Sequence, residues 1–289
     1  MANVLVTGAN GQLGMEFRKM DFTALDEVFY TDVAELDITD YAAIEDFVVK
    51  NEIDTIINCA AYTAVDKAEE ELELAEKINT LAVANLAKVA AQEDCLLIHI
   101  STDYVFDGTG NEPYTEKMKP CPVSTYGKTK WKGEQAIIKS GCMYLIIRTA
   151  WLYSVNGNNF VKTMLRLADE KEEVRVVSDQ MGTPTYAKDL AQAIFMILND
   201  DTLIEHEGIY HFTNKGCCSW YEFAKEIMRL GEKSCQVIPI STSEYPTKAC
   251  RPVYSVLDTA KIQTTFQVEV PEWKEALERM MKELQNTDL

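Results

Sequence analysis

Short apolar runs alternate with longer amphipathic stretches along the first half of the chain. Near-continuous apolar runs, rich in β-branched residues, predict strands at 4–7, 27–31, 55–59, 96–101 and 144–148. Residues 41–51 and 72–92 carry apolar side chains three and four positions apart, which predicts helices between the strands. Strands that are apolar on both faces are typical of parallel sheets covered by helices on both sides. The alternation therefore predicts an α/β fold with a doubly wound parallel sheet.

The pattern is less regular after residue 148. It predicts a sixth strand near 174–178, a further short strand at 208–213, and helices at 160–170, 188–198, 220–230 and 272–284. Ser219 is the expected N-cap of the helix at 220–230, and Glu222 completes a capping box. A chain of 289 residues, at about 150 residues per domain, is long enough for two domains.

The chain carries a strong negative charge. Lys and Arg number 28 and Asp and Glu 46, so the formal net charge is −18. Such a field repels phosphate backbones and anionic lipid, so we expect no nucleic-acid partner and no membrane surface. Any smaller anionic ligand needs a local positive site.

Cysteine usage and the amino terminus indicate a reducing compartment. The eight cysteines form no CxxC pair and have no histidine at zinc-ligand spacing, which argues against structural zinc. The chain enters a strand pattern directly, with no signal-peptide features, and no apolar run reaches the ~18 residues of a membrane helix. We therefore expect a cytoplasmic protein.

A glycine-rich turn follows the first predicted strand. Gly8, Gly11 and Gly14 lie within Gly8-Ala9-Asn10-Gly11-Gln12-Leu13-Gly14, ahead of a short helical stretch. Glycines at such a turn allow backbone amides and a helix N-terminus to approach a pyrophosphate. A purely structural turn is the alternative, but the position directly after a first strand favours a dinucleotide site.

Acidic residues follow the second predicted strand. Asp32 lies about 20 residues beyond the glycines, where a carboxylate is expected to bond the adenosine ribose. Its charge opposes a 2′-phosphate, and no Arg follows the strand, so NADH should at least be accepted. Asp37 and Ile38 come a few residues later, where an Asp reaches the adenine amino group.

Tyr126 and Lys130 lie four residues apart at the start of a predicted helix that ends at Ile138, so both are on one face. An ammonium beside a phenol lowers its pKa from about 10 and makes the tyrosine a usable proton donor. Ser101 and Thr102 end the fourth strand, at the edge where open α/β sheets bind ligands. A hydroxyl from either is expected to bond a substrate carbonyl beside Tyr126.

The combination of the glycine turn, the Ser101-Thr102 strand end and the Tyr126–Lys130 pair resembles the extended short-chain dehydrogenase/reductases. Finer motifs resemble the dTDP-4-dehydrorhamnose reductase family over nearly the whole chain; they are residues 7–14, 58–69, 101–106, 126–130, 148–153, 157–160, 179–185 and 251–252. The resemblance implies a Rossmann-like doubly wound parallel sheet, with a smaller α/β substrate-binding region at the C-terminal end. We expect a dinucleotide-binding domain at 1–178 and a substrate-binding domain at 179–289, with a helix at 187–199 that packs back on the first.

The resemblance also implies an activity. It is the reduction, with NADH or NADPH, of the 4-keto group of dTDP-4-dehydro-L-rhamnose, with Tyr126 as proton donor. Lys130 would hold the nicotinamide ribose and Thr102 would polarise the keto oxygen. The residues implied to bind the cofactor are Gly8, Gly11, Gln12, Leu13, Gly14, Asp32, Asp37, Ile38, Ala60, Ala61, Tyr62, Thr63, Ile100, Tyr126 and Lys130. Those implied to bind the substrate are Thr102, Asp103, Trp151 and Arg251.

One departure from the family concerns a metal. Some members are dimers bridged by magnesium through three glutamates, and two of those positions are Glu16 and Glu283 here. The third is Lys188, which removes a ligand and repels a cation. We expect no metal, and a monomer or weak homodimer that magnesium does not bridge.

Two alternatives to this activity stay open. One is another 4-keto-deoxysugar reductase, an epimerase or a dehydratase; Tyr104 after Asp103, where dehydratases often place a Glu, argues against dehydration. The other is a non-catalytic NAD(P)-binding subunit like the regulatory subunit of methionine adenosyltransferase. Tyr126, Lys130 and Thr102 are all present, which favours the enzyme.

Overall fold

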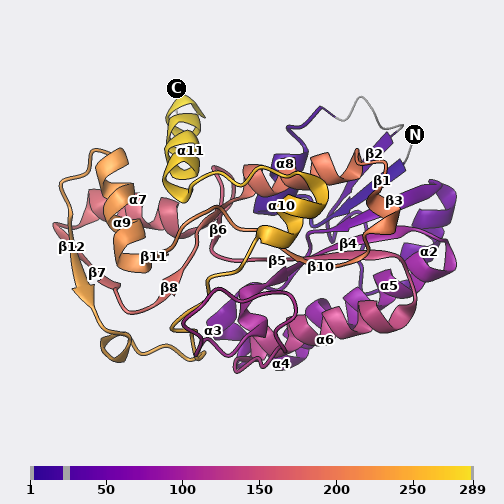
Figure 1. Ribbon diagram of the computed structural model, residues 1–289, viewed down its shortest axis with the longest axis horizontal. Helices are drawn as coiled ribbons and strands as arrows, with labels where there is room; N and C mark the ends of the chain where they lie inside the picture. Colours follow the sequence, from indigo (N-terminus) through magenta and orange to yellow (C-terminus); the bar gives the residue numbers. More distant parts are fainter. Residues whose placement is uncertain (1–2, 22–26, 288–289) are drawn as a thin grey trace.

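A parallel sheet of six strands lies at the centre of the computed structural model, which describes residues 3–21 and 27–287 (Figure 1). Its strands are β1 (Asn3–Thr7), β2 (Glu27–Thr31), β3 (Ile53–Asn58), β4 (Leu96–Thr102), β5 (Tyr144–Thr149) and β10 (Gly208–His211). Their order is β10-β5-β4-β3-β1-β2, and every neighbouring pair is parallel. The predicted parallel α/β sheet is confirmed.

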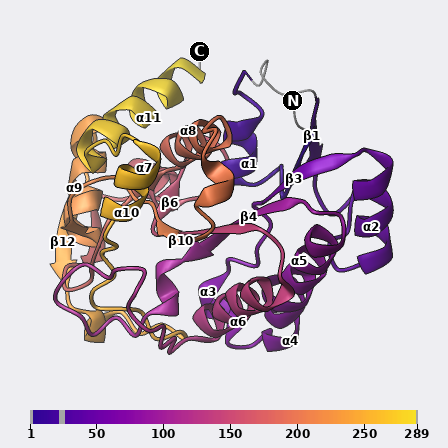
Figure 2. The same cartoon turned by 45° about the vertical axis from the view of Figure 1, so that its right-hand side comes forward.

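Helices cover both faces of this sheet, as Figure 2 shows. On one face, α1 (Gln12–Phe17), α8 (Ala187–Leu198) and α10 (Ala260–Phe266) share an apolar core with the strands. On the other, α2 (Tyr41–Lys50), α5 (Val83–Gln92) and α6 (Thr125–Ser140) form a second core. Each fully buried Leu or Ile there contributes about 1.5–3 kcal/mol. The sheet is therefore doubly wound, as predicted.

The strand predicted near 174–178 exists but is not the sixth strand of the main sheet. It is β7 (Glu173–Val177), which pairs in parallel with β12 (Gln236–Ile240) in a separate two-stranded sheet. The sixth position belongs to β10, which pairs with β5. Glu173 and Arg175 alternate with buried valines in β7, so one face is exposed, unlike the strands buried on both faces.

A third apolar core lies beside the main sheet, on the left of Figure 1. It joins β7 to α7 (Phe160–Glu170), α9 (Trp220–Leu230) and α11 (Trp273–Thr287). The expected capping box of Ser219 and Glu222 is present at α9. Helix α8 packs on the main sheet, while the division of the chain into domains at 178/179 stays a prediction.

The shorter elements are α3 (Val65–Ala68), β6 (Leu152–Tyr153), β8 (Met181–Gly182), β9 (Thr185–Tyr186), β11 (Cys218–Ser219) and 3₁₀ turns at Asp103–Val105, Leu203–Glu205 and Thr242–Glu244.

The helix predicted at 72–92 is interrupted. It consists of α4 (Leu72–Glu76), a π-helical segment (Lys77–Ala82) and α5. Such segments often occur at functional sites. Here the segment carries Asn79, whose side-chain Oδ1 accepts a hydrogen bond from the Tyr62 backbone N–H at 2.9 Å, while its Nδ2 donates to Thr129 Oγ1 at 3.3 Å. Asn79 therefore connects the loop after β3 to α6.

Helix α6 packs closely on the sheet, between two well-defined caps. Ser124 accepts from the Gly127 N–H at its start, and Gly141 ends it in the left-handed conformation. A fully buried ion pair joins it to β5, with Arg148 Nε and Nη2 donating to the two carboxylate oxygens of Glu134 at 2.9 and 2.6 Å. Within residues 3–21 and 27–287, no helix is long and apolar enough to cross a membrane.

The buried pair makes a stability prediction. Glu134→Gln should lower the free energy of unfolding by about 3–5 kcal/mol, because it leaves the Arg148 charge buried without a counter-charge. The matched control is Glu170→Gln, which removes the exposed pair with Arg166 and should cost less than about 1 kcal/mol. Urea denaturation measures both, and equal losses would contradict the prediction.

Candidate active site

The glycine-rich turn lies between β1 and α1 and touches two other strand ends. Gly8 has a φ of +65°, and a Cβ there would lie 2.6 Å from the Ala60 backbone nitrogen. The Asp32 carboxylate at the end of β2 accepts hydrogen bonds from the backbone N–H groups of Asn10 at 3.0 Å and Val33 at 2.8 Å. Only glycine fits at position 8 without strain, and Asp32 fastens the turn to β2.

A cavity of about 380 Å³ opens over this turn. The predicted cofactor residues in its wall are Gly8, Gly11, Asp32, Asp37, Ile38, Ala60 and Ala61. A wall of glycine and alanine backbone flanked by two carboxylates fits the adenosine and pyrophosphate portions of a dinucleotide. Thr39 donates a backbone hydrogen bond to Asp37, which lowers the pKa of that carboxyl.

Other predicted cofactor residues lie outside that cavity wall. Leu13 is buried in the core between α1 and the sheet, and a Cβ on Gly14 would lie 2.5 Å from the Ala9 Cα, so Gly14 serves close packing. The Gln12 side chain accepts from Asn159 Nδ2 at 3.0 Å, which connects the turn to the start of α7. Tyr62 donates its hydroxyl to Glu71 at 2.5 Å. The residues of this cavity that the sequence did not reveal are Val33, Leu36, Thr39, Cys59, Leu74, Lys77 and Ile78.

Tyr126 lies in the first turn of α6 and is half-buried beside the end of β4. Its ring packs edge-on against Tyr104, with centroids 5.5 Å apart. Burial raises the pKa of the Tyr126 phenol above its usual 10, and the neighbouring Thr102 hydroxyl only partly opposes this shift. Lys130 is not among the groups that shift the pKa of Tyr126, so the structure does not show the lowering expected from Lys130. Tyr126 keeps its proton throughout the neutral pH range.

Lys130 lies one helical turn further along and is 1% exposed. Its Nζ donates to the Ile100 carbonyl oxygen at 2.6 Å and lies 3.2 Å from Nε2 of His99. Burial lowers the pKa of Lys130 to about 8, although Glu134 and Cys59 act in the opposite direction. Ile100, a predicted cofactor residue, thus contributes a carbonyl that positions this ammonium or amine.

Thr102 and Asp103 lie where β4 ends, beside Tyr126. Thr102 Oγ1 donates to Asp103 Oδ1 at 3.0 Å and accepts from the Tyr104 N–H at 3.2 Å. The other carboxylate oxygen, Oδ2, is buried without a hydrogen bond to another described residue. Burial raises the pKa of Asp103 to about 6. A buried carboxyl with an unused oxygen suits a ligand that brings hydroxyl donors.

Arg251 contributes to a second cavity of about 630 Å³, bordered by α7, β7 and Trp220. Its Nη2 donates to Asp66 at 2.5 Å and its Nη1 to the Tyr104 hydroxyl at 3.4 Å, while its buried Nε has no partner among the described residues. A guanidinium with a spare donor fits an anionic ligand group.

Trp151 does not line that cavity. It adopts a φ of +48° and stacks on Trp220, with ring centroids 3.5 Å apart and planes 11° apart. A Cβ at Gly182 would lie 2.6 Å from the Trp151 ring. The aromatic residues that line the Arg251 cavity are instead Phe160, Trp220 and Tyr245. No sequence motif indicated Trp220 as a binding residue.

Glu283 and Lys188 meet on the surface between α8 and α11. Lys188 Nζ donates to Glu283 Oε2 at 2.8 Å and Lys19 Nζ to Oε1 at 2.9 Å, and Lys19 is also 3.4 Å from Glu16. Burial raises the pKa of Glu283, but hydrogen bonds from Lys188, Lys19 and Tyr186 outweigh this and bring it to about 2. Within the described ranges, no group of three or more His, Cys, Asp or Glu side chains could hold a metal ion.

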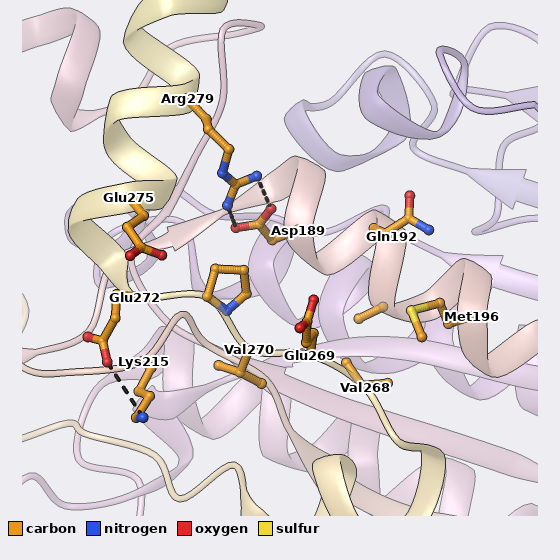
Figure 3. Close-up of a pocket in the computed structure, with 12 residues that line it drawn as sticks. Asp189, Gln192, Met196, Lys215, Val268, Glu269, Val270, Glu272, Glu275 and Arg279 are labelled. Atoms are coloured by element: carbon orange, nitrogen blue, oxygen red, sulfur yellow. Dashed lines mark hydrogen bonds and ion pairs between the residues drawn. The ribbon is translucent and has the colours of Figure 1, made fainter.

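Another cavity, of about 560 Å³, lies between α8, α11 and the segment before α11 (Figure 3). Arg279 donates to both carboxylate oxygens of Asp189 across it, each at 2.7 Å. None of the residues predicted to bind cofactor or substrate lines it. It is separate from the candidate active site.

The sheet, the glycine turn and the Tyr126–Lys130 pair beside a strand-end Thr together define an extended short-chain dehydrogenase/reductase. Residues 1–286 match the family described as RmlD substrate binding domain. The chain belongs to this family, and the predicted resemblance to dTDP-4-dehydrorhamnose reductases is confirmed.

Named relatives match over almost the entire length. The spore coat polysaccharide biosynthesis protein SpsK of Bacillus subtilis is 41% identical over 98% of each chain. A solved dTDP-4-dehydrorhamnose reductase from Clostridium acetobutylicum has a TM-score of 0.93 and 45% identity, covering 98% of this chain and 99% of its own. That from Bacillus anthracis, in complex with NADP, has a TM-score of 0.91 and 41% identity with the same coverage.

The Lys188 contact makes a prediction about assembly. Because an ammonium bonds Glu283 where some relatives place a third glutamate, the elution volume in gel filtration should be the same with EDTA and with magnesium. A dimer that dissociates on chelation would show that a bridging metal binds despite Lys188.

Gly127 makes a prediction about packing. A Cβ at this position would lie 2.2 Å from the Tyr104 carbonyl oxygen, which is backbone and cannot move freely. Gly127→Ala should therefore lower the free energy of unfolding by about 1–3 kcal/mol. Lys128→Ala, on the exposed side of the same turn, should change it by less than about 0.5 kcal/mol. Urea denaturation compares the two, and a neutral Gly127→Ala would refute the close approach.

Proposed function

We propose that this protein reduces the 4-keto group of dTDP-4-dehydro-L-rhamnose to dTDP-L-rhamnose with NADH or NADPH. The observation that carries the proposal is the placement of half-buried Tyr126 and buried Lys130 on one face of α6, beside Thr102. The cofactor-type cavity and the Arg251 cavity supply candidate binding regions for the two substrates. Relatives named for this reaction, about 40% identical over nearly their full length, support it.

The cofactor would occupy the cavity over the glycine turn. When bound, its nicotinamide supplies the hydride. Asp32 and Asp37 would hold the adenosine, and the backbone of the turn and the start of α1 would hold the pyrophosphate without a lysine or arginine. The Bacillus anthracis relative in complex with NADP supports NADPH as a cofactor, and Asp32 supports the acceptance of NADH.

Tyr126 would donate the proton to the oxygen of the reduced carbonyl. Its raised pKa keeps the phenol protonated at neutral pH, so the proton leaves only when a developing alkoxide creates demand for it. Thr102 would hydrogen-bond the same oxygen and orient it. Lys130 would hold the nicotinamide ribose and, as an ammonium, would stabilise the phenolate that forms.

The sugar nucleotide would bind on the other side of Tyr126. The unused Asp103 oxygen would accept from sugar hydroxyls, and the free Nε of Arg251 would bond the diphosphate. Trp151 and Trp220 form a stacked aromatic pair at this side, against which a sugar or base would pack. All eight cysteines are free thiols, which supports our proposal that the protein acts in the cytoplasm. We also propose that it is a monomer or weak homodimer.

The test is NADPH and NADH oxidation with dTDP-4-dehydro-L-rhamnose. Tyr126→Phe should lower kcat by about 100-fold or more, because it removes the proton donor but keeps the ring. The control is Tyr210→Phe, a buried tyrosine whose hydroxyl bonds the His206 carbonyl away from the site, and it should keep kcat within about 3-fold.

Two results would contradict the proposal in different ways. Normal turnover by Tyr126→Phe would remove the phenol from the mechanism. Tight cofactor binding with no turnover of this or any related 4-keto sugar would instead indicate a binding subunit, while turnover of a different 4-keto sugar would change only the substrate.

A further inference from the structure

The side chain of Lys130 is buried without a carboxylate partner among the described residues. None of the ion pairs between described residues includes it. The carboxylate one turn along α6, Glu134, already holds Arg148 in a two-bond contact and accepts from Ser101 at 2.5 Å. The other titratable groups that face Lys130 are Cys59, after β3, and His99, on β4. Burial raises the pKa of the Cys59 thiol to about 12, so the thiol is neutral at physiological pH and gives Lys130 no counter-charge.

Asn58 determines which nitrogen of His99 carries the hydrogen. Its Oδ1 accepts from the Ala60 backbone N–H at 3.1 Å and from Thr7 Oγ1 at 2.8 Å. A backbone N–H is always a donor, so this contact sets the orientation of the amide. The Nδ2 group then lies 2.9 Å from His99 Nδ1. An amide NH₂ can only donate, so Nδ1 is the acceptor and carries no hydrogen.

The hydrogen of His99 consequently points at Lys130. His99 is completely buried, and burial together with Lys130 lowers its pKa well below the usual value, so the ring is neutral. A neutral imidazole whose Nδ1 accepts has its hydrogen on Nε2. That N–H lies 3.2 Å from Lys130 Nζ. An ammonium has no lone pair to accept it, whereas a neutral amine does.

We infer that His99 is a positioning residue that directs its Nε2 hydrogen at Lys130 and thereby disfavours the ammonium form of Lys130 relative to the amine. The inference rests on the proposed function of Tyr126 and Lys130. Protonation of the Lys130 amine by solvent removes the lone pair that accepts this hydrogen, so the contact with His99 opposes protonation. The raised pKa of Tyr126 agrees with this, because Lys130 is not among the groups that lower it.

The tautomer can be measured on the cofactor-free protein, without any activity. The chain has only three histidines, so the ¹⁵N resonances lost in His99→Gln identify those of His99. Between pH 6 and 8, Nδ1 should resonate as an unprotonated nitrogen and Nε2 as a protonated one. In Asn58→Asp, the new carboxylate should accept a hydrogen bond from Nδ1. Nδ1 should then resonate as the protonated nitrogen and Nε2 as the unprotonated one. A protonated Nδ1 in the native protein would overturn the inference even if the reductase activity were absent.

The pH dependence of kcat/KM for NADPH tests the consequence for Lys130. This ratio reports groups of the free enzyme, and it should fall at alkaline pH as Lys130 loses its proton. His99→Gln can turn its amide oxygen towards an ammonium, and Asn58→Asp frees Nε2 as an acceptor. In both variants, the pH at which kcat/KM falls on the alkaline side (the alkaline limb) should rise by about one to two pH units.

His211→Gln is the matched control, because His211 is also fully buried but bonds the Tyr114 carbonyl and lies beside Arg148 instead of Lys130. It should leave the alkaline limb where it is, whatever it does to stability. An unchanged limb in both His99→Gln and Asn58→Asp would overturn the inference, and so would an equal shift in the His211 control.

Discussion

The close approach of α6 to the end of β4 and to the π-helical segment is the constraint on which the rest of the site depends. Tyr126, Lys130 and Glu134 lie four residues apart in turn, so one face of the helix turns all three towards the sheet. The approach is possible because Gly127 and Gly133 present no side chain; a Cβ on either would lie 2.2–2.3 Å from a backbone carbonyl oxygen. The Arg148–Glu134 pair then holds the helix to β5. The stability of the fold and the placement of Tyr126 thus have the same origin.

The same burial sets the charges of the site. Removal of water disfavours every ionised form, so the Tyr126 pKa rises while the pKa values of Lys130 and His99 fall. Burial therefore disfavours charge at the centre of the site, in a protein whose net charge is −18. That overall charge does not prevent the binding of dinucleotides or sugar nucleotides, because the local groups that would meet them are backbone amides and the Arg251 guanidinium. It does disfavour long polyanions.

Sequence patterns were informative where a feature is local. The five strands of the first half, the glycine turn and the spacing of Tyr126 and Lys130 all follow from neighbouring residues, and the structure has them at nearly the predicted bounds. The missed features come from contacts between distant segments. Strand β12 exists because β7 lies beside it, and Trp220 borders the Arg251 cavity only because α9 packs on α7. The π-helical turn at Asn79 interrupts a pattern that reads as one regular helix.

The sequence by itself determined the class of fold, the family and the residue types that make the candidate site. Apolar periodicity predicts a parallel sheet, and a glycine turn after the first strand predicts a dinucleotide cavity. Both predictions succeed because each pattern depends on residues that are close together in the sequence. Only the tertiary structure decided the ionisation of those residues. Whether Lys130 is an ammonium or an amine depends on burial and on a chain of hydrogen bonds from Ala60 through Asn58 to His99. These groups come from different strands and from α6, and no local pattern brings them together.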